Sequence, residues 1–485
     1  MKIFYTSDIH GYFMPTNYMD METKPMGLIS ASNNYVKSKS NLFIDCGDIL
    51  QGSVFDYYLS ENNNSKAVAD IVNKIGIDFI TVGNHDFNYG YDYLKNYLNN
   101  VNATCICANL VDKKGEITNL TDHAIVEIEG KKIGIIGAVT DWVNVWEQKK
   151  NLVGFEIKDT LSSLVNAYEN IKDCDYKICL YHGGIDFDPV TKEIVEDSGE
   201  NITSRIINAI DIDLVLCGHQ HLEITGVDYN GTKVVEPSFF GGKYAEIDIN
   251  LDNKNLKVKL RHIDGNFDEE KFSEEVLLNN KINEYIDRKI ATLDKDYLPK
   301  DRLEMALNGS ELASFINKIQ LELTGADVSM NALANEVSGF KKDLTIRQIL
   351  NTFRYPNTLE VYEIDGKTLR RGLNKNFEYI VKDENGYRIN EDYIIPKLSH
   401  YNFDFYDGIT YDIDFDKPFD SRVGNIYKDG RAVGDDEILT IVLNNYRATG
   451  VSGFDMYKGL KLVKKVDSDI SQLFIDYFKN KYNKG

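Results

Sequence analysis

Five apolar segments of this chain end in the same kind of residue. Each is followed, directly or after one glycine, by Asp, Asn or His, in the stretches Asp8-Ile9-His10, Gly47-Asp48, Gly83-Asn84-His85-Asp86, His182-Gly183-Gly184 and Gly218-His219-Gln220-His221. In α/β proteins, ligands bind at the carboxyl ends of the strands, because side chains converge there while helices cover the faces of the sheet. The pattern therefore predicts an α/β domain with a polar site built from five strand ends.

The rest of the chain indicates a second domain. A length of 485 residues exceeds the size at which one hydrophobic core keeps growing. Up to about residue 265, apolar runs alternate with amphipathic helical stretches, as in βαβ units, and runs 232–236, 244–251 and 256–262 suggest an antiparallel closing edge. An apolar stripe over 268–293 predicts a long linker helix, with a basal helix of the first domain as the alternative. We predict domains at 1–267 and 297–485, the latter α+β, joined by a linker helix within 268–296.

The composition of the chain limits the classes of ligand and partner that it can bind. A formal net charge of −21 disfavours binding to long nucleic acids, whereas a small anionic ligand is compatible with it if metal ions supply positive charge. No apolar run reaches the roughly 20 residues of a membrane span. We therefore expect a small anionic ligand, no long nucleic acid and no membrane; a monomer is also expected.

The start of the chain and its cysteines suggest a cellular compartment. Residues 1–8 leave no room for a secretory leader before the first strand, which predicts a cytoplasmic protein, although a chain trimmed after export would look the same. The cysteines show no zinc-type CxxC pairs and are expected to be buried and reduced; they are Cys46, Cys105, Cys107, Cys174, Cys179 and Cys217.

The strand-end side chains form a candidate metal-ligand set. One histidine at a strand end is more often packed than ligating, but five together with carboxylates and an amide are hard to explain by packing. Mixed oxygen and nitrogen donors suit Mn, Fe, Zn or Co better than Ca or Mg. Two ions about 3.5–4 Å apart can activate a water and clamp both oxygens of a phosphoryl displacement. The predicted ligands are Asp8, His10, Asp48, Asn84, His182, His219 and His221, with Asp48 as the bridge.

His85 remains outside this set. Asn84 is assigned to a metal, and the neighbouring imidazole points the other way along an extended backbone. We predict that His85 is the general acid for the departing oxygen, or stabilises charge on phosphate. The three histidines away from strand ends, His123, His262 and His400, are expected to be structural or exposed.

In their order along the chain, these motifs resemble the calcineurin-like metallophosphoesterases. With a linker helix and a second domain, the whole chain is similar to the two-domain nucleotidases, which include 5′-nucleotidases and 2′,3′-cyclic-nucleotide 2′-phosphodiesterase/3′-nucleotidases. The resemblance implies an α/β metallophosphoesterase β-sandwich flanked by helices (α/β/β/α). It also implies one metal on Asp8, His10, Asp48 and His221, a second on Asp48, Asn84, His182 and His219, and His85 as catalytic histidine.

The second domain favours one branch of that family. Relatives of the 5′-nucleotidase type carry an Asn-Gly-Gly-x-Arg phosphate grip, which residues 330–335 (MNALAN) lack. The segments around Asn357, Tyr401 and Asn445-Tyr446-Arg447 instead resemble the cyclic phosphodiesterase branch, in which two aromatics sandwich the base. By this resemblance Tyr401 and Tyr446 hold the base, with Asn357, Asn445 and Arg447 as further substrate contacts. The implied reactions convert 2′,3′-cyclic nucleotides to 3′-nucleotides, and 3′-nucleotides to nucleosides and phosphate.

Two alternatives remain open at this point. A 5′-nucleotidase or nucleotide-sugar hydrolase is favoured if Arg347, Arg354 or Arg447 grips phosphate. An inactive nucleotide-binding interaction protein would show a lost ligand, and none is lost. Asn88 helps to distinguish the branches of the family. At this position the 5′-nucleotidase branch has an Asp that orients the catalytic histidine. An amide can hold the ring by a hydrogen bond but cannot stabilise the imidazolium form by charge.

Overall fold

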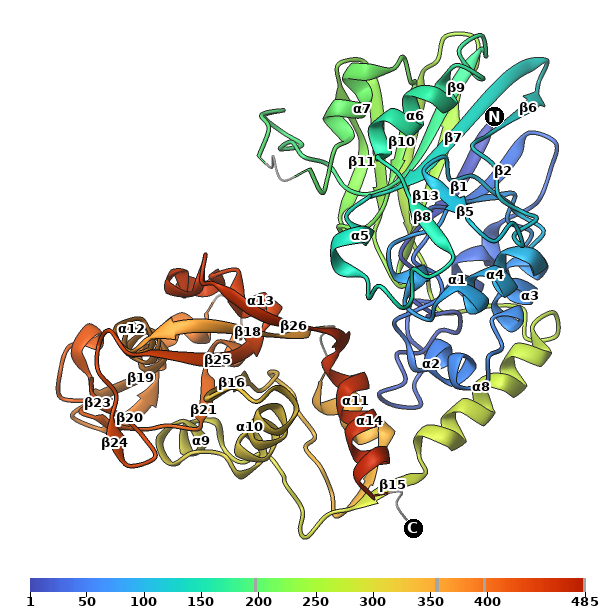
Figure 1. The fold of residues 1–485 in the computed structure, drawn as a ribbon. Helices are drawn as coiled ribbons and strands as arrows, with labels where there is room; N and C mark the ends of the chain where they lie inside the picture. The colour runs from blue at the N-terminus through green and yellow to red at the C-terminus, as the bar shows by residue number, and fades with distance from the viewer. Residues whose placement is uncertain (196–198, 354–356, 396–397, 483–485) are drawn as a thin grey trace. The chain divides into compact units, whose positions relative to one another are not determined.

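The computed structural model describes residues 1–195, 199–353, 357–395 and 398–482. The chain forms two compact units, Met1–Tyr285 and Ile286–Gly485 (Figure 1). Each unit has its own hydrophobic core and is described by itself.

The first unit is built on two six-stranded mixed sheets. The first sheet has the order β14 (Leu256–His262), β13 (Lys243–Ile249), β1 (Lys2–Thr6), β2 (Asn41–Asp45), β3 (Phe79–Ile80) and β4 (Thr104–Cys105). The second has the order β11 (Glu223–Tyr229), β12 (Thr232–Pro237), β10 (Leu214–Cys217), β9 (Tyr176–His182), β7 (Lys131–Val139) and β6 (His123–Ile128). Strands β1 to β4 run parallel, as do β7, β9, β10 and β12.

The two sheets pack face to face. Ile3 and Tyr5 of β1 share one buried core with Ile178 and Leu180 of β9. The other face of the second sheet, with Cys179, is covered by α6 (Thr160–Tyr168) and α7 (Thr203–Ala209) (Figure 1). The remaining elements of this unit are α1 (Leu28–Ala31), α2 (Val54–Glu61), α3 (Lys66–Ile75), α4 (Tyr91–Asn100), α5 (Val143–Trp146), α8 (Ser273–Ile286) and the pair β5 (Leu110–Asp112) and β8 (Phe155–Ile157). The predicted β-sandwich with flanking helices is confirmed.

Two details differ from the sequence prediction. Strands β13 and β14 form the predicted antiparallel edge in the first sheet, whereas β12 lies in the second sheet, antiparallel to β11 and parallel to β10. The helix predicted over 268–293 is shorter, since α8 ends at Ile286 and residues 289–292 form β15, which pairs with β17 (Asp343–Thr345).

Helix α8 is anchored to the first unit by polar contacts. Glu275 accepts a hydrogen bond from Lys74 Nζ at 2.7 Å, and Asn279 accepts one from the Tyr18 hydroxyl at 2.9 Å. The helix therefore packs as a basal element of that unit over much of its length.

The second unit is α+β. Its main sheet has the order β21 (Asp404–Asp407), β16 (Val328–Ala332), β25 (Ile438–Asn444), β18 (Thr358–Asp365) and β26 (Leu462–Asp469). Its helices are α9 (Arg302–Asn308), α10 (Glu311–Thr324), α11 (Ile346–Thr352), α12 (Gly366–Asn376), α13 (Asn445–Ala448) and α14 (Ile470–Tyr482). Smaller sheets are formed by β19 (Ile380–Asp383) and β20 (Gly386–Ile389), and by β22 (Thr410–Ile413), β23 (Val423–Lys428) and β24 (Arg431–Ala432).

All six cysteines are free and buried, as the sequence predicted. Within the described part of the chain, no helix combines the length and the apolar character that a bilayer span needs.

Candidate dimetal site

The predicted ligands come from both sheets of the first unit. Asp8 and His10 follow β1, Asp48 follows β2 and Asn84 follows β3, all in the first sheet. The second sheet supplies His182, the last residue of β9, together with His219 and His221, which follow β10. The site therefore lies along the seam between the two sheets. This agrees with the prediction that the strand ends converge on one crevice.

The backbone at this seam is strained. The residues Asp8, His10, Asp48, His219 and His221 have φ of 55°, 50°, 55°, 78° and 58°. Such left-handed conformations are uncommon for residues other than glycine and cluster at functional sites. They turn side chains of successive residues toward the same crevice.

Two glycines let the β2 and β3 loops meet. A Cβ on Gly47, whose φ is 92°, would lie 2.3 Å from the backbone nitrogen of Gly83. A Cβ on Gly83 would lie 2.2 Å from Asp48 Oδ1. Neither position has room for a side chain, so both glycines are required for Asp48 to sit at the centre of the site.

Asp86 holds these loops together. Its buried carboxylate accepts backbone hydrogen bonds from Asp48 (3.0 Å), Ile49 (2.9 Å), Leu50 (2.9 Å) and Gly83 (2.7 Å). Burial, followed by the charge of Asp48, raises the pKa of Asp86 to about 6. The sequence prediction quoted Asp86 in its motif but gave it no role.

Three of the histidines have one ring nitrogen already occupied. His10 Nδ1 donates to the Gln51 carbonyl at 2.8 Å, and His182 Nδ1 donates to the Cys46 carbonyl at 2.6 Å. His219 Nε2 lies 3.0 Å from the Glu200 carboxylate. Because carbonyl and carboxylate oxygens only accept, the remaining nitrogen of each neutral ring carries a lone pair.

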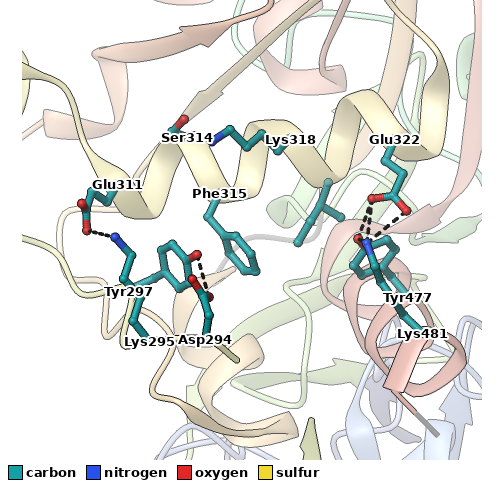
Figure 2. A pocket seen from close by; sticks show the side chains of 11 residues that line it. Asp294, Lys295, Tyr297, Glu311, Ser314, Phe315, Lys318, Glu322, Tyr477 and Lys481 are labelled. Atoms are coloured by element: carbon teal, nitrogen blue, oxygen red, sulfur yellow. Dashed lines mark hydrogen bonds and ion pairs between the residues drawn. The ribbon is translucent and has the colours of Figure 1, made fainter. Parts of the chain in front are cut away.

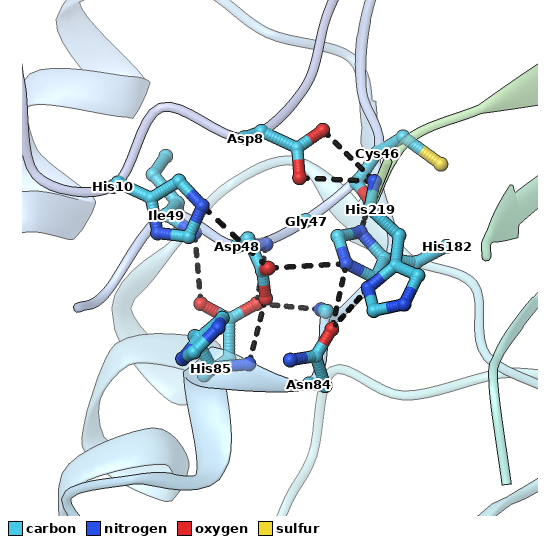
Figure 3. Close-up of polar contacts among 12 residues, drawn as sticks. Asp8, His10, Cys46, Gly47, Asp48, Ile49, Asn84, His85, His182 and His219 are labelled. Atoms are coloured by element: carbon cyan, nitrogen blue, oxygen red, sulfur yellow. Dashed lines mark hydrogen bonds and ion pairs between the residues drawn. The ribbon is translucent and has the colours of Figure 1, made fainter. Parts of the chain in front are cut away.

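These lone pairs converge with oxygen acceptors (Figure 3). His182 Nε2 lies 3.2 Å from Asp48 Oδ2 and 3.2 Å from Asn84 Oδ1, and His219 Nδ1 lies 2.9 Å from the same amide oxygen. On the other side, His10 Nε2 lies 3.1 Å from His221 Nε2 and 3.8 Å from Asp48 Oδ2. Asp48 is thus shared by two groups of acceptors, which is the arrangement expected of a bridging ligand.

The pKa values of the site residues also indicate that this site favours positive charge. Burial alone would lower the pKa of His182, but Asp48 and Asp8 raise it to about 10. Burial opposes ionisation of Asp48 too, yet His182 and His85 hold its pKa well below the usual range. The donor set therefore fits divalent cations, and two groups of such residues, Asp8, His10 and His221, and Asp8, Asp48 and His182, have ligand atoms mutually within 4.8 Å.

His85 and Asn88 lie beside the ligand groups. The backbone N–H of His85 donates to Asp48 Oδ1 at 2.7 Å, and the ring centroid lies 5.2 Å from that of His10. His85 Nδ1 lies 2.9 Å from Asn88 Oδ1. The hydrogen bond that an amide at position 88 can make to the ring is present, but the backbone is not extended here as predicted, because residues 85–87 form a 3₁₀ helix.

The predicted substrate residues in the second unit fall into different environments. Tyr446 on α13 is 43% exposed, whereas Tyr401 is half-buried. Asn445 Oδ1 accepts from the backbone N–H of Thr358 at 3.1 Å. Asn357 lines a cavity of about 50 Å³ together with Asn331 and Asn444, and among the described residues that line this cavity none is basic.

Arg447 was predicted as a substrate contact, but the structure places it in the interior of the second unit. Its side chain is 2% exposed, lies 4.1 Å over the Phe454 ring and forms an ion pair with Asp404 (Nε to Oδ2, 3.0 Å). It also donates to the Tyr401 carbonyl at 3.2 Å. Arg447 is thus a buried link between the segments that carry Tyr446 and Tyr401, because an unpaired guanidinium could not be buried there.

The other arginines weighed as phosphate grips give no support to that role. Arg347 forms an ion pair with Asp287 at 2.5 Å, and Arg354 lies outside the described residues. A second cavity, of about 470 Å³, lies between α10 and α14 (Figure 2). Two of its three lysines pair with its own acids, Lys295 with Glu311 and Lys481 with Glu322, and none of the predicted substrate residues lines it.

Comparison with known proteins agrees with the two-unit architecture. Residues 1–223 match the calcineurin-like phosphoesterase family, and residues 289–459 match the 5′-nucleotidase C-terminal domain. A crystal structure from Staphylococcus aureus, described as a candidate 5′-nucleotidase in complex with alpha-ketoglutarate, is 30% identical with a TM-score of 0.72, over 99% of this chain and 96% of that one. The chain belongs to the two-domain 5′-nucleotidase family of calcineurin-like phosphoesterases. It is therefore a hydrolytic enzyme of a family that uses divalent metal ions.

Curated relatives within this family differ in length. The trifunctional nucleotide phosphoesterase protein YfkN of Bacillus subtilis is 24% identical over 98% of this chain, which spans only 38% of that protein. The 2′,3′-cyclic-nucleotide 2′-phosphodiesterase/3′-nucleotidase of Salmonella typhimurium is 26% identical over 93% of this chain and 81% of its own length.

Proposed function

We propose that this phosphoesterase opens 2′,3′-cyclic mononucleotides to 3′-nucleotides and hydrolyses 3′-nucleotides to nucleosides and phosphate. The observation that carries the proposal is the convergence of imidazole lone pairs, carboxylates and an amide oxygen around Asp48, with His85 beside them. The names of relatives such as the Salmonella typhimurium enzyme supply the substrate class.

We propose two transition-metal ions, Mn, Zn, Fe or Co, for this site. Asp8, His10, Asp48 and His221 would hold one ion, and Asp48, Asn84, His182 and His219 the other. When bound, such a pair supplies a nucleophile at neutral pH and neutralises charge on the phosphoryl oxygens. The orienting contacts of His10, His182 and His219 would keep each ring turned toward its ion, as outer partners of metal-bound histidines do.

His85 is proposed as the proton donor to the leaving oxygen. Its Nδ1 is engaged by Asn88, so Nε2 is the ring nitrogen that remains for the substrate. A positioned general acid contributes typically about 10² to 10⁴ in rate. The leaving group that His85 protonates would be the ribose oxygen, which departs as a hydroxyl when its bond to phosphorus breaks.

The second unit is proposed to bind the nucleoside. Tyr446 presents an exposed ring, and stacking a base on such a ring contributes about 1–3 kcal/mol without selecting among bases. The segment that aligns with the phosphate grip of 5′-nucleotidases forms part of β16 and lines the small cavity of amide and apolar side chains. Neutral hydrogen-bonding groups suit a sugar or base edge better than a charged 5′-phosphate.

A comparison of substrates tests this proposal. Manganese-loaded protein is assayed on 2′,3′-cyclic AMP, 3′-AMP and 5′-AMP, with the chelated protein as the control. We expect the cyclic nucleotide and 3′-AMP to be hydrolysed and 5′-AMP to be a poor substrate. A clear preference for 5′-AMP would replace this proposal by the 5′-nucleotidase alternative, which the Staphylococcus aureus neighbour favours.

A further inference from the structure

The catalytic histidine candidate is tied to a carboxylate through an amide. His85 Nδ1 lies 2.9 Å from Asn88 Oδ1, and Asn88 Nδ2 donates to Glu147 Oε2. Glu147 is held in turn, since its other oxygen accepts from Asn151 Nδ2 at 2.8 Å. Asn151 Nδ2 also donates to the Asn88 carbonyl at 2.8 Å, which closes the network.

The chemistry of these groups fixes the direction of every hydrogen bond. An ionised carboxylate only accepts, so the side of the Asn88 amide that faces Glu147 must be the NH₂ group. The amide oxygen must then face His85. An amide oxygen also only accepts, so His85 Nδ1 must carry a proton.

We propose that Glu147 is a positioning residue that sets the tautomer and the ring orientation of His85 through Asn88. Glu147 lies 59 residues from Asn88 along the chain, in the loop that follows α5. With Nδ1 protonated, Nε2 is the nitrogen that presents a lone pair or a second proton to the site. The expected effect on kcat rests on the proposed function, because it requires His85 to act as the general acid. The hydrogen bonds that link Glu147, Asn88 and His85 do not depend on the substrate.

Glu147→Gln is the first test. The amide that replaces Glu147 keeps its oxygen as the acceptor of Asn151 Nδ2 and turns its NH₂ group toward Asn88. Asn88 must then turn its oxygen to that group and its own NH₂ to His85, so that His85 Nδ1 becomes the acceptor. In zinc-loaded protein with ¹⁵N-labelled histidine, the signals of the His85 ring nitrogens, assigned with His85→Gln, should change from the Nδ1–H form to the Nε2–H form. We expect kcat to fall about 10- to 100-fold, which is less than the ~10²–10⁴ that a general acid contributes as a whole, and KM to change less than about twofold.

A charge exchange is the second test. Asn88→Asp alone places two carboxylates in contact and should lower kcat more than Glu147→Gln does. Asn88→Asp combined with Glu147→Gln restores one acceptor between two donors and should recover most of the activity and the Nδ1–H signal. This comparison remains decisive if Glu147→Gln by itself does not fold.

Controls make the test of Glu147 independent of the proposed nucleotide substrate. Glu156→Gln removes an exposed carboxylate on the neighbouring β8 and should leave both readouts unchanged. The same variants are assayed on bis(p-nitrophenyl) phosphate, so that a wrong nucleotide assignment does not hide the effect. A Glu147→Gln protein with wild-type kcat and an unchanged His85 spectrum would overturn the proposal, as would a double variant less active than Asn88→Asp alone.

Discussion

Replacement of Arg447 by methionine is the most direct test of its buried role. Methionine fills similar volume but leaves the Asp404 carboxylate, which is 2% exposed, without its partner. Burial already raises the pKa of Asp404 against the effect of Arg447, so the lone carboxylate would be strongly disfavoured. Breaking one side of a buried ion pair costs about 3–5 kcal/mol.

The expected change is large enough to measure by calorimetry. The second unit has about 200 residues, for which 1 kcal/mol shifts the unfolding temperature by roughly 2–4 °C. We therefore expect its transition to fall by about 6–20 °C. Chelation identifies the transition of the first unit, because metal binding stabilises only the unit that holds the metal.

Two comparisons decide whether the loss of the ion-pair partner of Asp404 causes the lower unfolding temperature. Arg431→Met removes an exposed arginine that pairs with Glu437 and should leave the transition nearly unchanged. Asp404→Asn in the Arg447→Met background removes the orphaned charge and should restore much of the lost stability. If the double variant is no more stable than Arg447→Met, or if Arg447→Met raises KM with no thermal shift, Arg447 acts on substrate and the buried role is refuted.

Three further outcomes follow from the proposed division of labour. Tyr446→Ala should raise KM about 5- to 150-fold, matching a loss of about 1–3 kcal/mol, with kcat changed little; unchanged nucleoside binding in calorimetry would exclude stacking. His85→Ala should lower kcat about 10²- to 10⁴-fold with KM nearly unchanged; a change confined to KM would contradict the assignment. Asp86→Asn, which leaves two of four backbone N–H groups without an acceptor, should weaken metal retention in dialysis measured by elemental analysis, whereas Asp92→Asn on the surface should not.

The clustering of the candidate ligands could be predicted because these residues share one sequence signal. Each candidate ligand ends a buried strand, and strand ends converge in this class of fold. Strand β7 (Lys131–Val139) likewise coincides with an apolar run, and α3 ends at Gly76, which has a left-handed φ of 89°. These features depend on a few neighbouring residues.

What the sequence missed depends on contacts between distant segments. Arg447 stands in a motif resembling substrate contacts, and only tertiary packing shows that it is buried against Asp404. Asn88 was interpreted as an amide without charge support, but Glu147, in a loop with no motif, places a carboxylate directly behind it. Glu200 contacts His219 in a comparable way. A search for acidic residues in the loops that follow β7 and β9 would have brought Glu147 and Glu200 forward as candidates.

The left-handed backbone at the seam has a consequence for how this protein tolerates change. Five of the predicted ligands adopt conformations that glycine reaches without the roughly 1–2 kcal/mol penalty of other residues. Substituting glycine at Asp8 or His221 should relieve that penalty while removing a ligand. A screen of random variants for thermal stability in the absence of metal should therefore enrich inactive proteins at these very positions, and only a selection for turnover would retain the native residues.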